Sequence, residues 1–173
     1  PGASPFSLTG QPNAMGGREV GGLANQLAAH MEFNDQHIHQ VREFWESPNL
    51  ARQPGLKAVD LFNAIEAGTV KALWVIGTNP AVSLPNASLV VRALQQAELV
   101  VVSDCIASTD TTQHAHVLLP ATGWGEKDGT VTNSERRLSR QRGSVNPAGE
   151  ARQDWRILTD VAHAMGYGKH FPY

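Results

Sequence analysis

The clearest strand signal in the sequence is Lys71-Ala-Leu-Trp-Val-Ile-Gly-Thr-Asn-Pro80 (KALWVIGTNP). Its apolar run has no polar alternation and stops at Gly77-Thr78-Asn79-Pro80, a turn-forming sequence. A short apolar run without alternation is typical of a strand buried on both faces of a parallel sheet. We therefore expect a strand over Lys71–Ile76, with a polar turn at its carboxyl end.

The same pattern of a short apolar run that ends in polar residues or proline recurs twice downstream. Leu99–Val102 is continuously apolar and ends at Ser103-Asp104, and His116–Leu119 is a third short strand that closes at Pro120. Segments with helical spacing of apolar residues alternate with these runs. They are Asp60–Ala67, stopped by Gly68, then Asn86–Ala97, a weak short helix at Thr109–Ala115, and Arg152–Met165, stopped by Gly166. The pattern predicts an α/β fold that is Rossmann-like, with a mostly parallel sheet and helices on both faces.

The first part of the chain is less regular. We expect a single domain in which residues 1–57 are a lead-in segment with helices and residues 58–173 form the Rossmann-like core. The elements expected in the lead-in are a short strand at Phe6–Leu8, a loop at Gln11–Gly17, helices at Glu19–Met31 and His37–Trp45, and a connection at Asn49–Gly55.

Composition excludes several classes of protein. The chain has 173 residues, 41% of them hydrophobic and 17% charged, and a formal net charge of -2. These values are typical of a globular chain, and they give no field that favours nucleic acid or a membrane. The apolar runs are too short to span a bilayer. The one cysteine, Cys105, excludes an internal disulfide and a four-cysteine iron–sulfur cluster, and it fits a reducing compartment.

Polar residues stand at the ends of the three expected strands, where ligands bind in open parallel sheets. Gly77 allows a phosphate to approach the backbone, although the turn lacks the GxGxxG pattern and could simply end the strand. Asp104 can accept hydrogen bonds from ribose hydroxyls or a guanine edge, or it can cap a helix. Lys127, in a glycine-rich stretch after the third strand, offers a charge for a phosphate, or belongs to a solvated hairpin.

Five segments, in order along the chain, resemble the molybdenum-bis(molybdopterin guanine dinucleotide) oxidoreductases of the dimethyl-sulfoxide-reductase superfamily. The resemblance is strongest to the bacterial assimilatory nitrate reductase catalytic subunit. The segments are FSLTGQPNAMGGREVGG (6–22), WVIGTNP (74–80), VSDCIASTDTT (102–112), HVLLPATGWGEKDGTVTNSERR (116–137) and PAGEARQDW (147–155). The Gly-Arg-Glu-Val-Gly pattern in the first segment points to nitrate reductases within this superfamily.

The resemblance implies a set of residues that contact one guanine dinucleotide arm of the cofactor. These positions are Asn79, Ser103, Asp104, Lys127 and Asp154. Asp154 can also be read as a residue in the first turn of a helix, where a carboxylate suits the helix dipole. Cys105 departs from the proline that is common in the related periplasmic enzymes, and this leaves the local turn uncertain.

The resemblance also implies what the parent protein contains. Its catalytic subunit carries a [4Fe–4S] cysteine motif, a segment that ligates molybdenum and a C-terminal domain, none of which matches this sequence. The chain would thus be an internal fragment of a cytoplasmic enzyme, inactive alone, whose partners are the remaining domains and an electron donor (ferredoxin, flavodoxin or an NADH-linked subunit). Alternatives are a fragment of another molybdopterin enzyme such as formate dehydrogenase, a stand-alone nucleotide-binding module, and a non-catalytic interaction protein.

Overall fold

The computed structural model describes residues 10–173, and these pack as two compact units. One, here called the hairpin unit, consists of the chain through Lys57 together with residues 129–141. The other, the sheet unit, consists of residues 58–128 and 142–173. The expected strand at Phe6–Leu8 lies outside the described residues. The single domain expected from the sequence stays a prediction.

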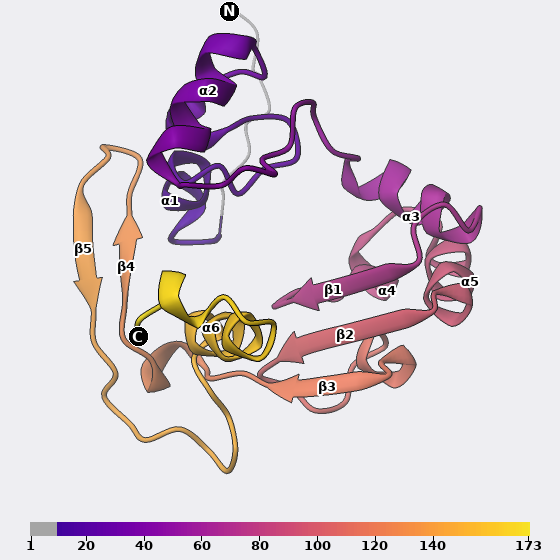
Figure 1. Cartoon of the computed structure of the whole chain (residues 1–173). Helices are drawn as coiled ribbons and strands as arrows, with labels where there is room; N and C mark the ends of the chain where they lie inside the picture. The colour runs from indigo at the N-terminus through magenta and orange to yellow at the C-terminus, as the bar shows by residue number, and fades with distance from the viewer. Residues whose placement is uncertain (1–9) are drawn as a thin grey trace, which may run out of the picture. The chain divides into compact units, whose positions relative to one another are not determined.

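The sheet unit is built on three parallel strands in the order β1-β2-β3. They are β1 (Ala72–Ile76), β2 (Leu99–Asp104) and β3 (Val117–Pro120), and their arrowheads point the same way in Figure 1. The predicted parallel sheet and α/β class are confirmed. The strand order runs in one direction, so the described strands do not include the reversal that marks a switch point in doubly wound folds.

One face of this sheet is covered by helices. The connections carry α3 (Ala58–Glu66), α4 (Pro80–Ser83), α5 (Ala87–Gln96) and the 3-10 turn η2 (Thr112–His114). On the strands Val75, Val100 and Val102 point to this face, because residues two apart share a face. They pack in one core with Phe62, Ile65, Val90 and Leu94. Burial of each such side chain stabilises the fold by about 1.5–3 kcal/mol.

The other face of the sheet is partly open. Ile76, Leu99 and Val117 lie on it and are 41–42% exposed. The last helix, α6 (Asp154–Ala164), lies beside β3, where Ile157 and Val161 share a hollow of about 260 Å³ with Leu119. Covering helices are thus described along the whole of one face and only beside β3 on the other.

Residue Arg152 extends the sheet by one position. Its amide donates to Pro120 O at 3.0 Å, its carbonyl accepts from Thr122 N at 2.9 Å, and Ala121 pairs with it as an isolated parallel bridge. Because α6 begins two residues later, this bridge anchors the first turn of the helix at the carboxyl end of β3. Figure 1 shows α6 beside the arrowheads of the sheet.

The hairpin unit combines distant parts of the sequence. Its helical elements are α1 (Ala14–Glu19), the 3-10 turn η1 (Ala28–His30) and α2 (Asp35–Phe44), and its hairpin is the antiparallel pair β4 (Gly129–Thr132) and β5 (Leu138–Gln141). A small core of Leu27, Ile38 and Val41 holds α2 against the preceding segment. Asn34 Oδ1 caps α2 by accepting from His37 N at 2.9 Å.

Two expectations for the lead-in were wrong. The segment Glu19–Met31 is not a helix, and the expected loop at Gln11–Gly17 contains the start of α1. Gly21 adopts φ +76°, and Ala29 and His30 also have positive φ, so the chain turns twice where a continuous helix was expected. The helical spacing of Val20 and Leu23 does not reflect burial, because these side chains are 65% and 42% exposed.

Smaller differences concern element ends. The weak helix expected at Thr109–Ala115 is the single 3-10 turn η2, and the four-residue helix α4 was not anticipated. Further 3-10 turns lie at Trp124–Glu126 (η3) and Gly168–His170 (η4).

No helix among residues 10–173 is long and apolar enough to cross a membrane.

Candidate functional site

The carboxyl ends of β1, β2 and β3 meet at one edge of the sheet unit, here called the carboxyl edge. Asn79 follows β1 by three residues and is half-buried. Its Oδ1 accepts from Thr111 Oγ1 at 2.6 Å and from Thr111 N at 3.2 Å. Thr111 Oγ1 in turn accepts from Ala81 N at 3.2 Å. Asn79 therefore ties the turn after β1 to the β2–β3 connection, while the described hydrogen bonds leave its Nδ2 donors unused.

The end of β2 presents one buried and one accessible polar side chain. Ser103 is 1% exposed, and its Oγ accepts from Trp74 Nε1 at 2.9 Å on the open face of the sheet. Asp104 is half-buried and its Oδ1 accepts from Ile106 N at 3.0 Å, which closes a tight turn. No helix begins at Asp104, so it is not the helix cap considered from the sequence. Its Oδ2 has no partner among the described hydrogen bonds and can accept from a ligand.

The segment after β3 brings together two of the residues implied by the resemblance. Lys127 Nζ donates to Asp154 Oδ2 at 2.8 Å, with the two side chains 25% and 33% exposed. Asp154 is the first residue of α6, as the sequence suggested. Glu126 holds the turn that carries Lys127, because its Oε2 accepts from Gly123 N at 2.6 Å and its Oε1 from Ala148 N at 3.1 Å.

Thr122 is a residue of this edge that the sequence reasoning missed. It is 3% exposed, and its Oγ1 is the only buried side-chain oxygen or nitrogen in residues 10–173 without a hydrogen-bond partner. An unsatisfied buried hydroxyl costs about 1–3 kcal/mol. Nothing in the sequence pattern distinguishes Thr122 from a packing residue, since only its surroundings reveal the missing partner.

The carboxyl edge thus offers several unused polar groups within one unit. Nδ2 of Asn79 is a donor, Oδ2 of Asp104 is an acceptor, and Oγ1 of Thr122 can be either. A ligand that carries hydroxyl, amide and phosphate groups suits this set. Ser103 is turned toward Trp74, so a contact from its side chain to a ligand stays a prediction. No group of three His, Cys, Asp or Glu within residues 10–173 could hold a metal ion.

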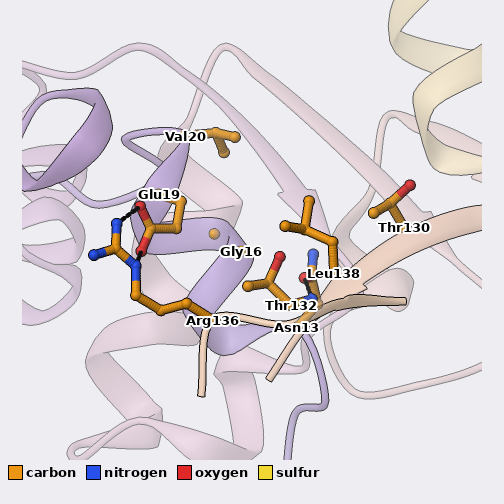
Figure 2. Close-up of a pocket in the computed structure, with 9 residues that line it drawn as sticks. Asn13, Gly16, Glu19, Val20, Thr130, Thr132, Arg136 and Leu138 are labelled. Atoms are coloured by element: carbon orange, nitrogen blue, oxygen red, sulfur yellow. Dashed lines mark hydrogen bonds and ion pairs between the residues drawn. The ribbon is translucent and has the colours of Figure 1, made fainter. Parts of the chain in front are cut away.

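The Gly-Arg-Glu-Val-Gly pattern lies elsewhere, in the hairpin unit. Arg136 Nε lies 2.9 Å from Glu19 Oε1 and its Nη2 donates to Oε2 at 2.9 Å, and His30 Nε2 lies 3.0 Å from Oε1. The hydrogen bonds from His30, and next from Arg136, lower the pKa of Glu19. Glu19 and Arg136 line a cavity of about 460 Å³ between α1 and the hairpin. Figure 2 shows these two side chains with the other residues of the cavity wall.

Glycines on either side of this pattern, which is Gly17–Gly21, allow close approach. Asn13 Oδ1 accepts from Thr132 N at 2.9 Å, and a Cβ at Gly16 would lie 2.1 Å from that oxygen. A Cβ at Gly22 would lie 2.9 Å from Gly17 O. The pattern and the glycines that flank it therefore form the junction of α1 with the hairpin.

Comparison with known proteins places these features in a family. The family model described as "Molybdopterin oxidoreductase" matches residues 3–164. The chain belongs to the molybdopterin oxidoreductase family. A similar protein is a nitrate reductase of Klebsiella oxytoca, which is 58% identical over 173 residues; these cover all of this chain and 20% of the relative. The assimilatory nitrate reductase catalytic subunit of Bacillus subtilis (strain 168) is 38% identical over 96% of this chain and 24% of the relative.

A solved structure supports the fold of this molybdopterin oxidoreductase chain. Acetylene hydratase from Pelobacter acetylenicus matches with a TM-score of 0.62 and 22% sequence identity, over 94% of this chain and 21% of that chain. At this identity the likeness concerns the fold alone. The chain spans about a fifth to a quarter of the length of the relatives named here.

Proposed function

We propose that this chain is the part of a cytoplasmic assimilatory nitrate reductase that holds one guanine dinucleotide arm of a molybdenum-bis(molybdopterin guanine dinucleotide) cofactor. The similarity to nitrate reductases over the whole chain supports the substrate, nitrate, and the product, nitrite. The observation that carries the binding role is the pair of unused polar groups at the carboxyl edge, from Asn79 and Asp104.

Each implied residue has a role that follows from its chemistry. Asp104 accepts from ribose hydroxyls or the guanine edge through its unpaired Oδ2, and Asn79 donates from Nδ2 to orient the arm. Lys127 offsets phosphate charge, and Asp154 aligns that ammonium by its hydrogen bond. Ser103 supports the edge by holding Trp74. When bound, the cofactor supplies the oxygen-atom transfer chemistry, while the protein supplies position and charge.

The rest of the site belongs to other parts of the parent polypeptide in this proposal. The remaining domains would carry the [4Fe–4S] cluster and the molybdenum ligand, and an electron donor (ferredoxin, flavodoxin or an NADH-linked subunit) would reduce the cluster. A few charge-assisted hydrogen bonds contribute on the order of 1.5–3 kcal/mol each, which is enough for tight binding only when other domains bury the ligand. We therefore expect the 173-residue chain alone to bind the cofactor weakly and to reduce no nitrate with a viologen donor.

The test uses the full-length nitrate reductase that contains this chain. Asp104→Asn and Lys127→Met should each reduce the guanine nucleotide retained per polypeptide, measured as GMP released by acid after gel filtration. Lys71→Met is the matched control, because Lys71 pairs with Glu98 at 2.7 Å at the other end of the sheet. Equal retention in Asp104→Asn, Lys127→Met and the parent protein would contradict the proposed function. The division of the binding site among several domains has its own test, which is calorimetry on the 173-residue chain alone. Nanomolar binding of the dinucleotide by that chain would contradict this division.

A further inference from the structure

The hydroxyl of Thr122 requires a partner that the described chain does not provide. Its Oγ1 is buried and unpaired, although a threonine hydroxyl can donate one hydrogen bond and accept two. Nearly all buried polar groups in native proteins have a partner from protein, water or a bound group. Other buried threonines of this unit follow that rule, because Thr111 bonds to Asn79 and Thr159 Oγ1 donates to Trp155 O at 2.8 Å.

The position of Thr122 connects it to the ion pair of the carboxyl edge. Its backbone amide donates to Arg152 O at 2.9 Å, two residues before Asp154. The next residue, Gly123, begins the turn that Glu126 closes and that ends at Lys127. Thr122 therefore stands at the base of the turn that carries Lys127, beside the strand segment that leads to Asp154.

The Lys127 ammonium has three donors and binds Asp154 with one of them, so a rotation of its flexible side chain is enough to bring it to a phosphate. The ammonium lies 2.8 Å from Asp154 Oδ2 in a partly shielded site. Thr122 directly precedes the 123–127 turn that Glu126 closes. Because Thr122 is 3% exposed, a ligand can reach its hydroxyl only if this turn opens.

We propose that Thr122 is a further binding residue for the phosphate-bearing arm of the guanine dinucleotide. In this proposal the 123–127 turn opens as the ligand binds, the hydroxyl of Thr122 donates a hydrogen bond to a ligand oxygen, and Lys127 contacts the phosphate. This inference rests on the proposed function, because it assigns a further contact to the same ligand. An internal water that satisfies the hydroxyl at all times is the competing explanation.

The test replaces Thr122 with valine in the full-length nitrate reductase, since valine has nearly the same shape and no hydroxyl. Guanine nucleotide retention should become about tenfold weaker, the size expected for one hydrogen bond to a charged group. The thermal midpoint of the cofactor-free protein, from a host that makes no molybdopterin, should stay the same or rise, because an unsatisfied hydroxyl has been removed. Thr122→Ser keeps the hydroxyl and should retain most of the nucleotide.

Thr159→Val is the matched control, because Thr159 is 4% exposed and its hydroxyl is already paired. This variant should keep parental retention, with a lower midpoint. If Thr122→Val retains as much nucleotide as the parent while Lys127→Met loses it, the Thr122 contact is refuted and the proposed function stands. If Thr122→Val lowers the cofactor-free midpoint, the hydroxyl has a permanent partner and the proposal also falls. If neither Lys127→Met nor Asp104→Asn loses nucleotide, the proposed function itself fails.

Discussion

Lys127 and Asp154 are joined by a 2.8 Å hydrogen bond between an ammonium and a carboxylate that are 27 residues apart. The bond links the turn after β3 to the first residue of α6, so two residues implied by the resemblance restrain each other. In the proposed function, the cation that contacts a phosphate thus already has a carboxylate partner. The other donors of the ammonium allow it to bind a ligand oxygen as well as Asp154.

Breaking that ion pair should have a measurable but modest effect on stability. We expect the coupling energy between Lys127→Met and Asp154→Asn to be about 1 kcal/mol or less, because both side chains keep some exposure and solvent screens them. A double-mutant cycle by urea denaturation of the 173-residue chain measures it. The coupling should shrink in 1 M salt. A coupling that is absent at low salt would contradict the pairing.

Ser103 should act on stability more than on ligand binding. Ser103→Ala removes the acceptor of the Trp74 indole and should lower the free energy of unfolding by about 1 kcal/mol. Guanine nucleotide retention by the full-length variant should stay within about twofold of the parent, in contrast to Asp104→Asn. A large loss of nucleotide with unchanged stability would instead show that the Ser103 side chain contacts the ligand.

Two adjacent glycines in α1 should respond to alanine in opposite directions. Gly16→Ala would place a Cβ 2.1 Å from Asn13 Oδ1 and displace it from Thr132 N, so we expect a loss of about 1–2 kcal/mol. A Cβ at Gly17 meets nothing within 4 Å, so Gly17→Ala should stabilise α1 by about 0.5–1 kcal/mol.

Urea denaturation of both glycine variants in the 173-residue chain checks this difference. In an Asn13→Ala background the obstacle is gone, and Gly16→Ala should then become neutral or stabilising. Equal effects of Gly16→Ala and Gly17→Ala in the parent chain would rule out the close approach of Asn13.

The ion pairs of Glu19 should make the hairpin unit sensitive to acid. The pKa of Glu19 is lowered from its ordinary value of 4.5 by hydrogen bonds from His30 and from Arg136. A carboxylate whose folded pKa is depressed stabilises the fold above its unfolded pKa, and this contribution is lost as the pH falls through the folded pKa. The thermal midpoint of the parent chain should therefore exceed that of Glu19→Gln at neutral pH, and the difference should shrink as the pH falls below 4.5.

Glu43→Gln is the control for this pH dependence. The pair of Glu43 with His39 is 3.4 Å long and about 70% exposed, so its removal should change the midpoint little at any pH. A Glu19→Gln midpoint that runs parallel to that of the parent from neutral pH to about pH 3 would contradict the role of Glu19.

The sheet unit was largely predictable because its signals are local. Runs such as Leu73–Ile76 and Val100–Val102 are apolar without alternation, which is typical of strands in a covered parallel sheet. The strand ends then located Asn79 and Asp104 at one edge. The helix α4 and the 3-10 turn η2 escaped prediction because they are single turns with no repeated apolar spacing.

The failures lie where contacts join distant residues. The hydrogen bond from Thr132 N to Asn13 Oδ1 joins residues that are 119 apart, and the sequence around Asn13 does not indicate it. The positive φ angles of Ala29 and His30 likewise interrupt the helix that the spacing of apolar residues predicts over Glu19–Met31. For the site, residue types suggested Asp104 and Lys127, but neither the bond between Lys127 and Asp154 nor the unpaired hydroxyl of Thr122 can be read from spacing.

The two-part origin of the hairpin unit has a consequence for synthesis. The N-terminal segment through Lys57 reaches its hairpin only after residues 58–128 have left the ribosome, because β4 and β5 come later in the chain. Glu19 can form its ion pair only after Arg136 has been synthesised. The three strands of the sheet come earlier than Arg136 in the chain, so they can assemble first, in the order of translation. Chains truncated before residue 136 lack the ion pair of Glu19 with Arg136, so protease should cut α1 faster in them than in the 173-residue chain.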